Sequence, residues 1–69
     1  MKISARNVLP GTVLKIVRGP VTTEVTLEIA PGVQVVSTIT SSAAQSLQLN
    51  EGGKAYAVIK ASSVMVGTD

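Results

Sequence analysis

Hydrophobic and polar residues alternate along most of the chain with a period of two, which is typical of half-buried β-strands. The clearest example is the segment TEVTLEI, residues 23–29, in which Val25, Leu27 and Ile29 alternate with polar side chains. The same alternation predicts three further strands, over residues 12–18, 33–40 and 54–60.

Alternation also predicts which side chains share a face of each strand. In the first strand, Val13, Lys15 and Val17 are expected on one face. In the last strand, Ala57 is expected to face away from Tyr56. The turns between the strands are predicted at Gly19-Pro20, at Pro31-Gly32 and over residues 50–53.

One segment departs from the period of two. In TSSAAQSLQL, Ala43, Ala44 and Leu47 recur at helical spacing behind a Thr-Ser-Ser cluster that can cap a helix. We therefore expect a short helix from about Ser42 to Leu49. Four or five strands, with one short helix between the third and the last long strand, predict an all-β fold: a small, twisted barrel of the oligonucleotide/oligosaccharide-binding (OB) type.

The composition indicates that the chain assembles with copies of itself. The 69 residues fit one domain, residues 1–69, whose core alone supplies only about 3 to 5 kcal/mol of stability. The chain has no cysteine and no histidine, which excludes disulfides and argues against a structural zinc site. Apolar residues nevertheless make up 45% of the chain, more than so small a monomer can bury. We therefore expect a symmetric homo-oligomer.

The charged and aromatic residues do not favour nucleic acid as a partner. The net charge is only +2, the six basic residues are scattered, and Tyr56 is the only aromatic residue on which a base can stack. No apolar run is long enough to span a membrane, and the first residues do not resemble a secretory signal. We expect a cytoplasmic protein that binds neither nucleic acid nor a membrane.

Residues that could carry catalysis are few. Of the four acids, Glu24 and Glu28 share a strand face, which is typical of a solvated surface rather than of a general acid and base. The serines have no histidine to activate them as nucleophiles. We expect no enzymatic activity, no cofactor and no site for a metal cation.

Hydrogen-bond donors, by contrast, gather at three boundaries between the predicted elements. These groups are Ser4 with Arg6, the run from Thr40 to Ser42, and the run from Lys60 to Ser63. Hydroxyls, cations and free backbone N–H groups are the donors that hold an anion. If the three groups meet in space, they can surround an anion.

The chain resembles the molbindin family, also called the Mop proteins, over essentially its whole length. The resemblance rests on SARN near the start, LPGTVLKIVRG, EVTLEI, STIT before the predicted helix, LQLNEGG after it, and AYAVIKASSVMV near the end. Their combined order and spacing are more selective than any one of them. The resemblance implies a five-stranded OB-type barrel, assembled as a hexamer from three dimers, that binds molybdate or tungstate between subunits in the cytoplasm.

The resemblance also implies where the anion binds. By position, the family's site falls on Ser4, Arg6, Thr40, Lys60 and the backbone N–H of Ala61. Relatives often carry a serine where this chain has Ala43, so this chain lacks one hydroxyl there unless Ser41 or Ser42 replaces it. Some relatives also have serine at the position of Ala61. The full candidate set for an oxyanion is Ser4, Arg6, Thr40, Ser41, Ser42, Lys60, Ala61 and Ser62.

The donor chemistry fits such a ligand without reference to the family. Molybdate at neutral pH is a dianion without protons, and a site made only of donors can satisfy all its oxygens, whereas phosphate carries a proton that needs an acceptor. None of the candidate residues is an acid. The leading prediction is storage or buffering of molybdate or tungstate. Two alternatives are an OB-type module for single-stranded nucleic acid and a sensor subunit that acts on a partner when it is loaded.

Overall fold

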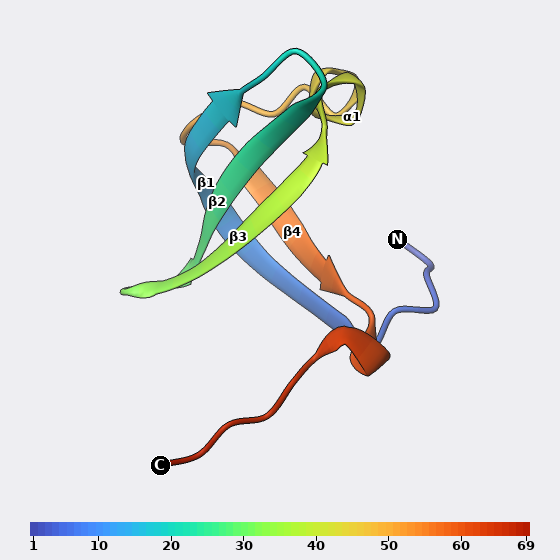
Figure 1. The fold of residues 1–69 in the computed structure, drawn as a ribbon, viewed down its shortest axis with the longest axis vertical. Coiled ribbons are helices and arrows are strands. Elements are labelled where there is room, and N and C mark those ends of the chain that lie inside the picture. Colours follow the sequence, from blue (N-terminus) through green and yellow to red (C-terminus); the bar gives the residue numbers. More distant parts are fainter.

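Four strands form one antiparallel sheet with the spatial order β3-β2-β1-β4 (Figure 1). The computed structural model describes all 69 residues. Strands β1, β2 and β3 follow one another as a meander, and the chain then passes through a short helix before β4 returns to pair with β1. The bounds are β1 Asn7–Arg18, β2 Thr22–Ala30, β3 Val33–Thr40, α1 Ser41–Ser46, β4 Lys54–Ile59 and the 3₁₀ turn η1 Ala61–Ser63.

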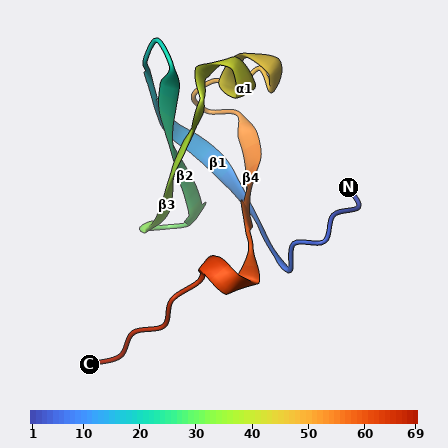
Figure 2. The same ribbon diagram turned by 45° about the vertical axis from the view of Figure 1, so that its right-hand side comes forward.

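Strand β1 is the central element because it pairs with two partners along its 12 residues. Its first half, Asn7–Thr12, pairs with β4, and its second half, Thr12–Arg18, pairs with β2. The sheet curls into a half-barrel that is open between β3 and β4, the two strands at its edges (Figures 1 and 2).

The structure has four strands, which agrees with the four or five that the sequence pattern predicts and is one fewer than the family resemblance implies. After β4 and η1 the chain does not return to the sheet. Residues 64–69 instead extend away from the half-barrel (Figure 1). The all-β class, the single short helix and its place between the third and the last strand are as predicted. No helix has the length and apolar character needed to cross a membrane.

The core of the half-barrel is small and consists of Val13, Val25, Leu27 and Ala57. The predicted alternation in β2 is confirmed. Val25 and Leu27 are both buried, whereas Glu24, which precedes Val25 and lies on the opposite face, is exposed. In β4, Ala57 is buried whereas Tyr56 lies on the other face and is 59% exposed. Only six residues of the whole chain are buried, so one subunit hides little of its apolar surface.

The predicted faces of β1 are wrong after Leu14, because the strand contains a β-bulge. Val13 pairs with Leu27, but Lys15 pairs with the very next residue of β2, Thr26, so β1 holds one extra residue at Leu14. The alternation therefore shifts by one position after the bulge. Ile16 packs against the core and Lys15 is exposed, so Val13 and Lys15 do not share a face as predicted.

The helix is shorter than predicted because it begins one residue earlier and ends three residues earlier. Thr40 is the N-cap, and its hydroxyl accepts a hydrogen bond from the N–H of Ala43 at 3.0 Å. Ala44 is the only buried residue of the helix. Gln48 has a φ of 54°, in the left-handed region, which turns the chain out of the helix before Leu49.

Candidate functional site

The first and last strands bring the two ends of the domain together. Asn7, the first residue of β1, pairs with Ile59, the last residue of β4, and the Asn7 side-chain amide donates to the Ile59 carbonyl at 3.2 Å. The residues just before β1 and just after β4 therefore meet. They line a cavity of about 570 Å³, formed by Ser4, Ala5, Arg6, Val58, Lys60, Ala61 and Ser62.

This cavity carries positive charge and no carboxylate. Arg6 and Lys60 both line it, and neither side chain makes a hydrogen bond within the subunit. Ser4 and Ser62 add two exposed hydroxyls. The cavity thus presents two cations and two neutral donors to solvent, without an acid to neutralise them.

The η1 turn adds backbone donors to the cavity. The N–H of Ser63 donates to the carbonyl of Lys60 at 2.8 Å, and the N–H of Val64 donates to the carbonyl of Ala61 at 3.2 Å. These two bonds define the turn and leave the N–H groups of Ala61 and Ser62 without a partner in the subunit. Both groups are therefore free to donate to a ligand.

The remaining candidates lie at the opposite end of the half-barrel. Both views place α1 at one end and η1 at the other (Figures 1 and 2). Thr40 and Ser42 are exposed there, and the Thr40 hydroxyl still has its hydrogen to donate because it accepts at the helix cap. One subunit therefore gathers five of the eight candidate residues in one cavity and holds Thr40, Ser41 and Ser42 apart from them.

Ser41 has a structural partner that the sequence did not reveal. Its hydroxyl donates to the carbonyl of Gly19 at 2.6 Å and lies 2.7 Å from the hydroxyl of Thr23, which is 1% exposed. Since a serine has only one hydroxyl hydrogen, the Thr23 hydroxyl must be the donor to Ser41. Ser41 thus ties α1 to the β1–β2 turn and has no hydrogen left to give an anion.

Sequence reasoning missed two residues of the cavity end. Val58 supplies an apolar wall, and Asn7 holds the start of β1 against the end of β4. Asn7 belongs to the SARN run, which marks it as part of the same segment, but only the pairing of β1 with β4 shows what its amide does.

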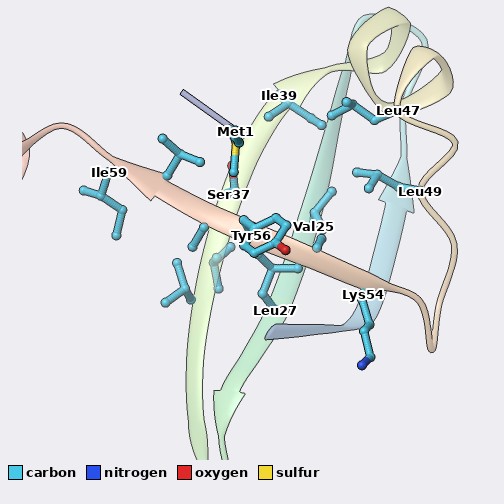
Figure 3. A pocket seen from close by; sticks show the side chains of 15 residues that line it. Met1, Val25, Leu27, Ser37, Ile39, Leu47, Leu49, Lys54, Tyr56 and Ile59 are labelled. Atoms are coloured by element: carbon cyan, nitrogen blue, oxygen red, sulfur yellow. The ribbon is translucent and has the colours of Figure 1, made fainter. Parts of the chain in front are cut away.

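A second hollow lies between the open edges of β3 and β4, with a volume of about 600 Å³ (Figure 3). We call it the apolar groove, because 13 of its 15 lining residues are hydrophobic. They include Val35 and Ile39 from β3, Leu49 from the segment after α1, and Tyr56 and Ile59 from β4. The groove offers apolar contacts rather than donors, so its chemistry differs from that of the cavity around Arg6 and Lys60.

The comparisons with known proteins show the family of the chain and its fold. The TOBE domain family matches residues 3–66. A probable molybdenum-pterin-binding protein of Haemophilus influenzae is 48% identical over the full length of both chains. The molybdenum transport protein ModE of Herbaspirillum seropedicae is also 48% identical, but this chain spans only 26% of its length.

Two solved structures have closely similar folds. MopII from Clostridium pasteurianum is 42% identical, with a TM-score of 0.90 over 97% of this chain and 100% of that chain. A molybdate-binding protein from Sporomusa ovata is 37% identical, with a TM-score of 0.91 over 99% of this chain and 100% of that chain. The chain therefore belongs to the TOBE domain family and, within it, to the group of molybdenum-pterin-binding (Mop) proteins.

Proposed function

We propose that the protein binds molybdate or tungstate as a storage or buffering protein, without enzymatic activity, in an oligomer whose subunits share the anion sites. The observation that carries the proposal is the cavity in which Arg6, Lys60 and two unpaired backbone N–H groups meet without any carboxylate. The names of the relatives support molybdate as the anion, since one solved relative is a molybdate-binding protein.

The cavity suits a tetrahedral dianion in charge and in hydrogen bonding. Two cations match the charge of molybdate, and charge-assisted hydrogen bonds are about twice as strong as neutral ones. Ser4 and Ser62 can donate to the oxygens that the cations do not reach. Molybdate and tungstate have the same charge and almost the same size, so we expect both to bind.

The separation of the candidate donors supports a shared site. Thr40 lies at the opposite end of the subunit from Arg6 and Lys60, so an anion that contacts both ends must lie between two copies. Assembly would also cover the apolar surface that a single subunit leaves exposed. We propose the hexamer of three dimers that the family resemblance implies.

The C-terminal segment offers a physical reason for assembly. Val64, Met65 and Val66 are 50%, 93% and 94% exposed, and they extend away from their own subunit (Figure 1). The apolar groove between β3 and β4 meanwhile lacks a covering strand (Figure 3). An extended apolar segment of one copy and an open apolar groove of another complement each other.

The surface of the sheet argues against a module for single-stranded nucleic acid. The outer face of β2 carries Glu24 and Glu28, which would repel a phosphate backbone. The only aromatic side chain, Tyr56, lies on β4, which β1 separates from β2. A stacking platform for successive bases needs several aromatic residues on adjacent strands.

Native mass spectrometry of the protein titrated with molybdate tests the proposal, because one spectrum reports the number of subunits and the number of bound anions. We expect one oligomeric species that gains a fixed number of anions. The matched control is phosphate at the same concentration. A chain that remains monomeric, or an oligomer that gains no molybdate, would contradict the proposed function.

A further inference from the structure

The residues that precede β1 connect the two hollows of the subunit. Met1 lines the apolar groove between β3 and β4 (Figure 3), whereas Ser4 and Arg6 line the cavity at the other side of this segment. Only Lys2 and Ile3 separate Met1 from Ser4, and this length of chain spans at most about 10 Å when it is fully extended. The start of the chain at the groove is therefore tethered closely to two donors of the cavity.

The two hollows also share a wall residue. Val58 of β4 lines both of them, and its side chain is 49% exposed. Tyr56 lies on the same face of β4, two positions earlier, and lines only the groove. The groove and the cavity are thus neighbours along β4, which is an edge strand of the sheet.

Little holds the first six residues in place within one subunit. Residues 1–6 form no hydrogen bond with the rest of the subunit, and the hydrogen-bonded structure begins at Asn7. Met1 is 77% exposed, so the surface that it buries at the groove is small. We call residues 1–6 the N-terminal strap. The strap reaches both hollows and is fixed at neither.

We propose that the N-terminal strap closes over the C-terminal segment of a second copy when that segment fills the apolar groove, and that this closure raises the affinity of the cavity for its anion. The inference rests on the proposed function, since the occupant of the groove is residues 64–66 of another subunit and the anion is molybdate or tungstate. It goes further because it couples the groove and the cavity of one subunit through a named segment.

The physical reason is the order in which the contacts form. A filled groove offers Met1 more apolar surface than the open groove does, and because Met1 is mostly exposed in the free subunit, most of its burial occurs only at this step. A fixed Met1 restricts the positions of Ser4 and Arg6, so the anion meets donors that are already ordered and binds more tightly. Since binding free energies are linked, the anion must favour the filled groove by the same factor.

Variants of Met1 test this coupling. Cleavage of an N-terminal fusion directly before residue 1 yields Met1→Ser, which loses the apolar contact, and Met1→Leu, which keeps it. The matched control is Val33→Ser, because Val33 is an exposed apolar residue of β3 that does not line the groove. Calorimetry measures molybdate binding at a concentration at which native mass spectrometry shows each protein assembled. We expect Met1→Ser to bind molybdate about tenfold more weakly, and Met1→Leu and Val33→Ser to bind it like the parent.

Lengthening the tether tests the same coupling without the loss of any side chain. Two glycines inserted between Lys2 and Ile3 keep Met1, Ser4 and Arg6 but let the cavity move independently of the groove. We expect this insertion to weaken molybdate binding about as much as Met1→Ser does, with the number of subunits unchanged.

The outcomes separate the inference from the proposed function. Parental molybdate affinity in Met1→Ser or in the glycine insertion would overturn the inference and leave the proposed function intact. Loss of assembly in Met1→Ser at every concentration would overturn it as well, because Met1 would then act in assembly rather than between the two hollows. A parent protein that binds no molybdate would overturn the proposed function itself.

Discussion

Replacing Met65 with aspartate provides a sharp test of how the copies assemble. Met65 is 93% exposed in one subunit, and its side chain contacts no part of the core. If the subunit were complete by itself, a substitution at so exposed a position would change stability by no more than about 0.5 kcal/mol. If the segment lies in the apolar groove of a second copy, the same substitution must weaken assembly strongly.

The size of that effect follows from burial and charge. Burying a methionine side chain contributes about 1.5 to 3 kcal/mol, and the exposed fraction of Met65 means that nearly all of this arises only on assembly. A carboxylate in the same apolar surroundings adds several kcal/mol of desolvation cost. We therefore expect Met65→Asp to cost about 4 kcal/mol or more for each segment, which is about a thousandfold in the dissociation constant.

Light scattering and native mass spectrometry over a dilution series measure this change. Thr68→Asp is the matched control, because it adds the same charge to the same segment beyond the apolar run of residues 64–66. We expect the control to remain assembled at concentrations where Met65→Asp dissociates. An oligomer of Met65→Asp with the mass and concentration dependence of the parent would refute the reasoning.

Four further substitutions test the site and the fold. Arg6→Ala or Lys60→Ala should weaken molybdate binding by about 1.5 to 3 kcal/mol in calorimetry, because each removes a charge-assisted hydrogen bond, whereas Lys15→Ala on the outer face of β1 should bind like the parent. Ser41→Ala should lower the free energy of unfolding by about 1 to 3 kcal/mol in urea, because it leaves the buried Thr23 hydroxyl without its acceptor; an unchanged midpoint would contradict this assignment. Gly11→Ala should destabilise the fold by about 1 to 3 kcal/mol, since a Cβ there would lie 2.7 Å from a backbone oxygen of β2; a parental melting temperature would show that the strands can separate without cost.

The strands could be predicted from the sequence because their alternation is regular, and the exceptions have local causes. The faces of β1 were predicted wrongly past Leu14, since a bulge adds a residue to one strand without any special residue type to mark it. The helix was predicted too long because Leu47 and Leu49 extend the apolar pattern. The left-handed turn at Gln48, a residue with no preference for it, ends the helix there.

The candidate site was only half predictable, for a different reason. Arg6 and Lys60 were assigned through the family resemblance, and the antiparallel pairing of β1 with β4 brings both to one cavity. Thr40 lies at the opposite end of the subunit, so its proposed contact with the anion depends on how two copies pack, which no local pattern in one chain encodes. The role of Ser41 could not be predicted either. A serine at the start of a helix is typical of a cap, and only the structure shows that its hydroxyl donates to the Gly19 carbonyl.

The pairing of β1 with β4 also determines when the anion cavity can exist. Asn7 and Ile59 are 52 positions apart, so closing this pair requires nearly the whole chain to be in place. The hairpins of β1 with β2 and of β2 with β3 close much shorter loops and carry most of the buried core. Distant contacts cost more loop entropy and tend to form later in folding. We therefore expect the cavity to form late in folding and to open early in the native state, so that the amide hydrogens of Asn7 and Ile59 exchange faster than that of Val25.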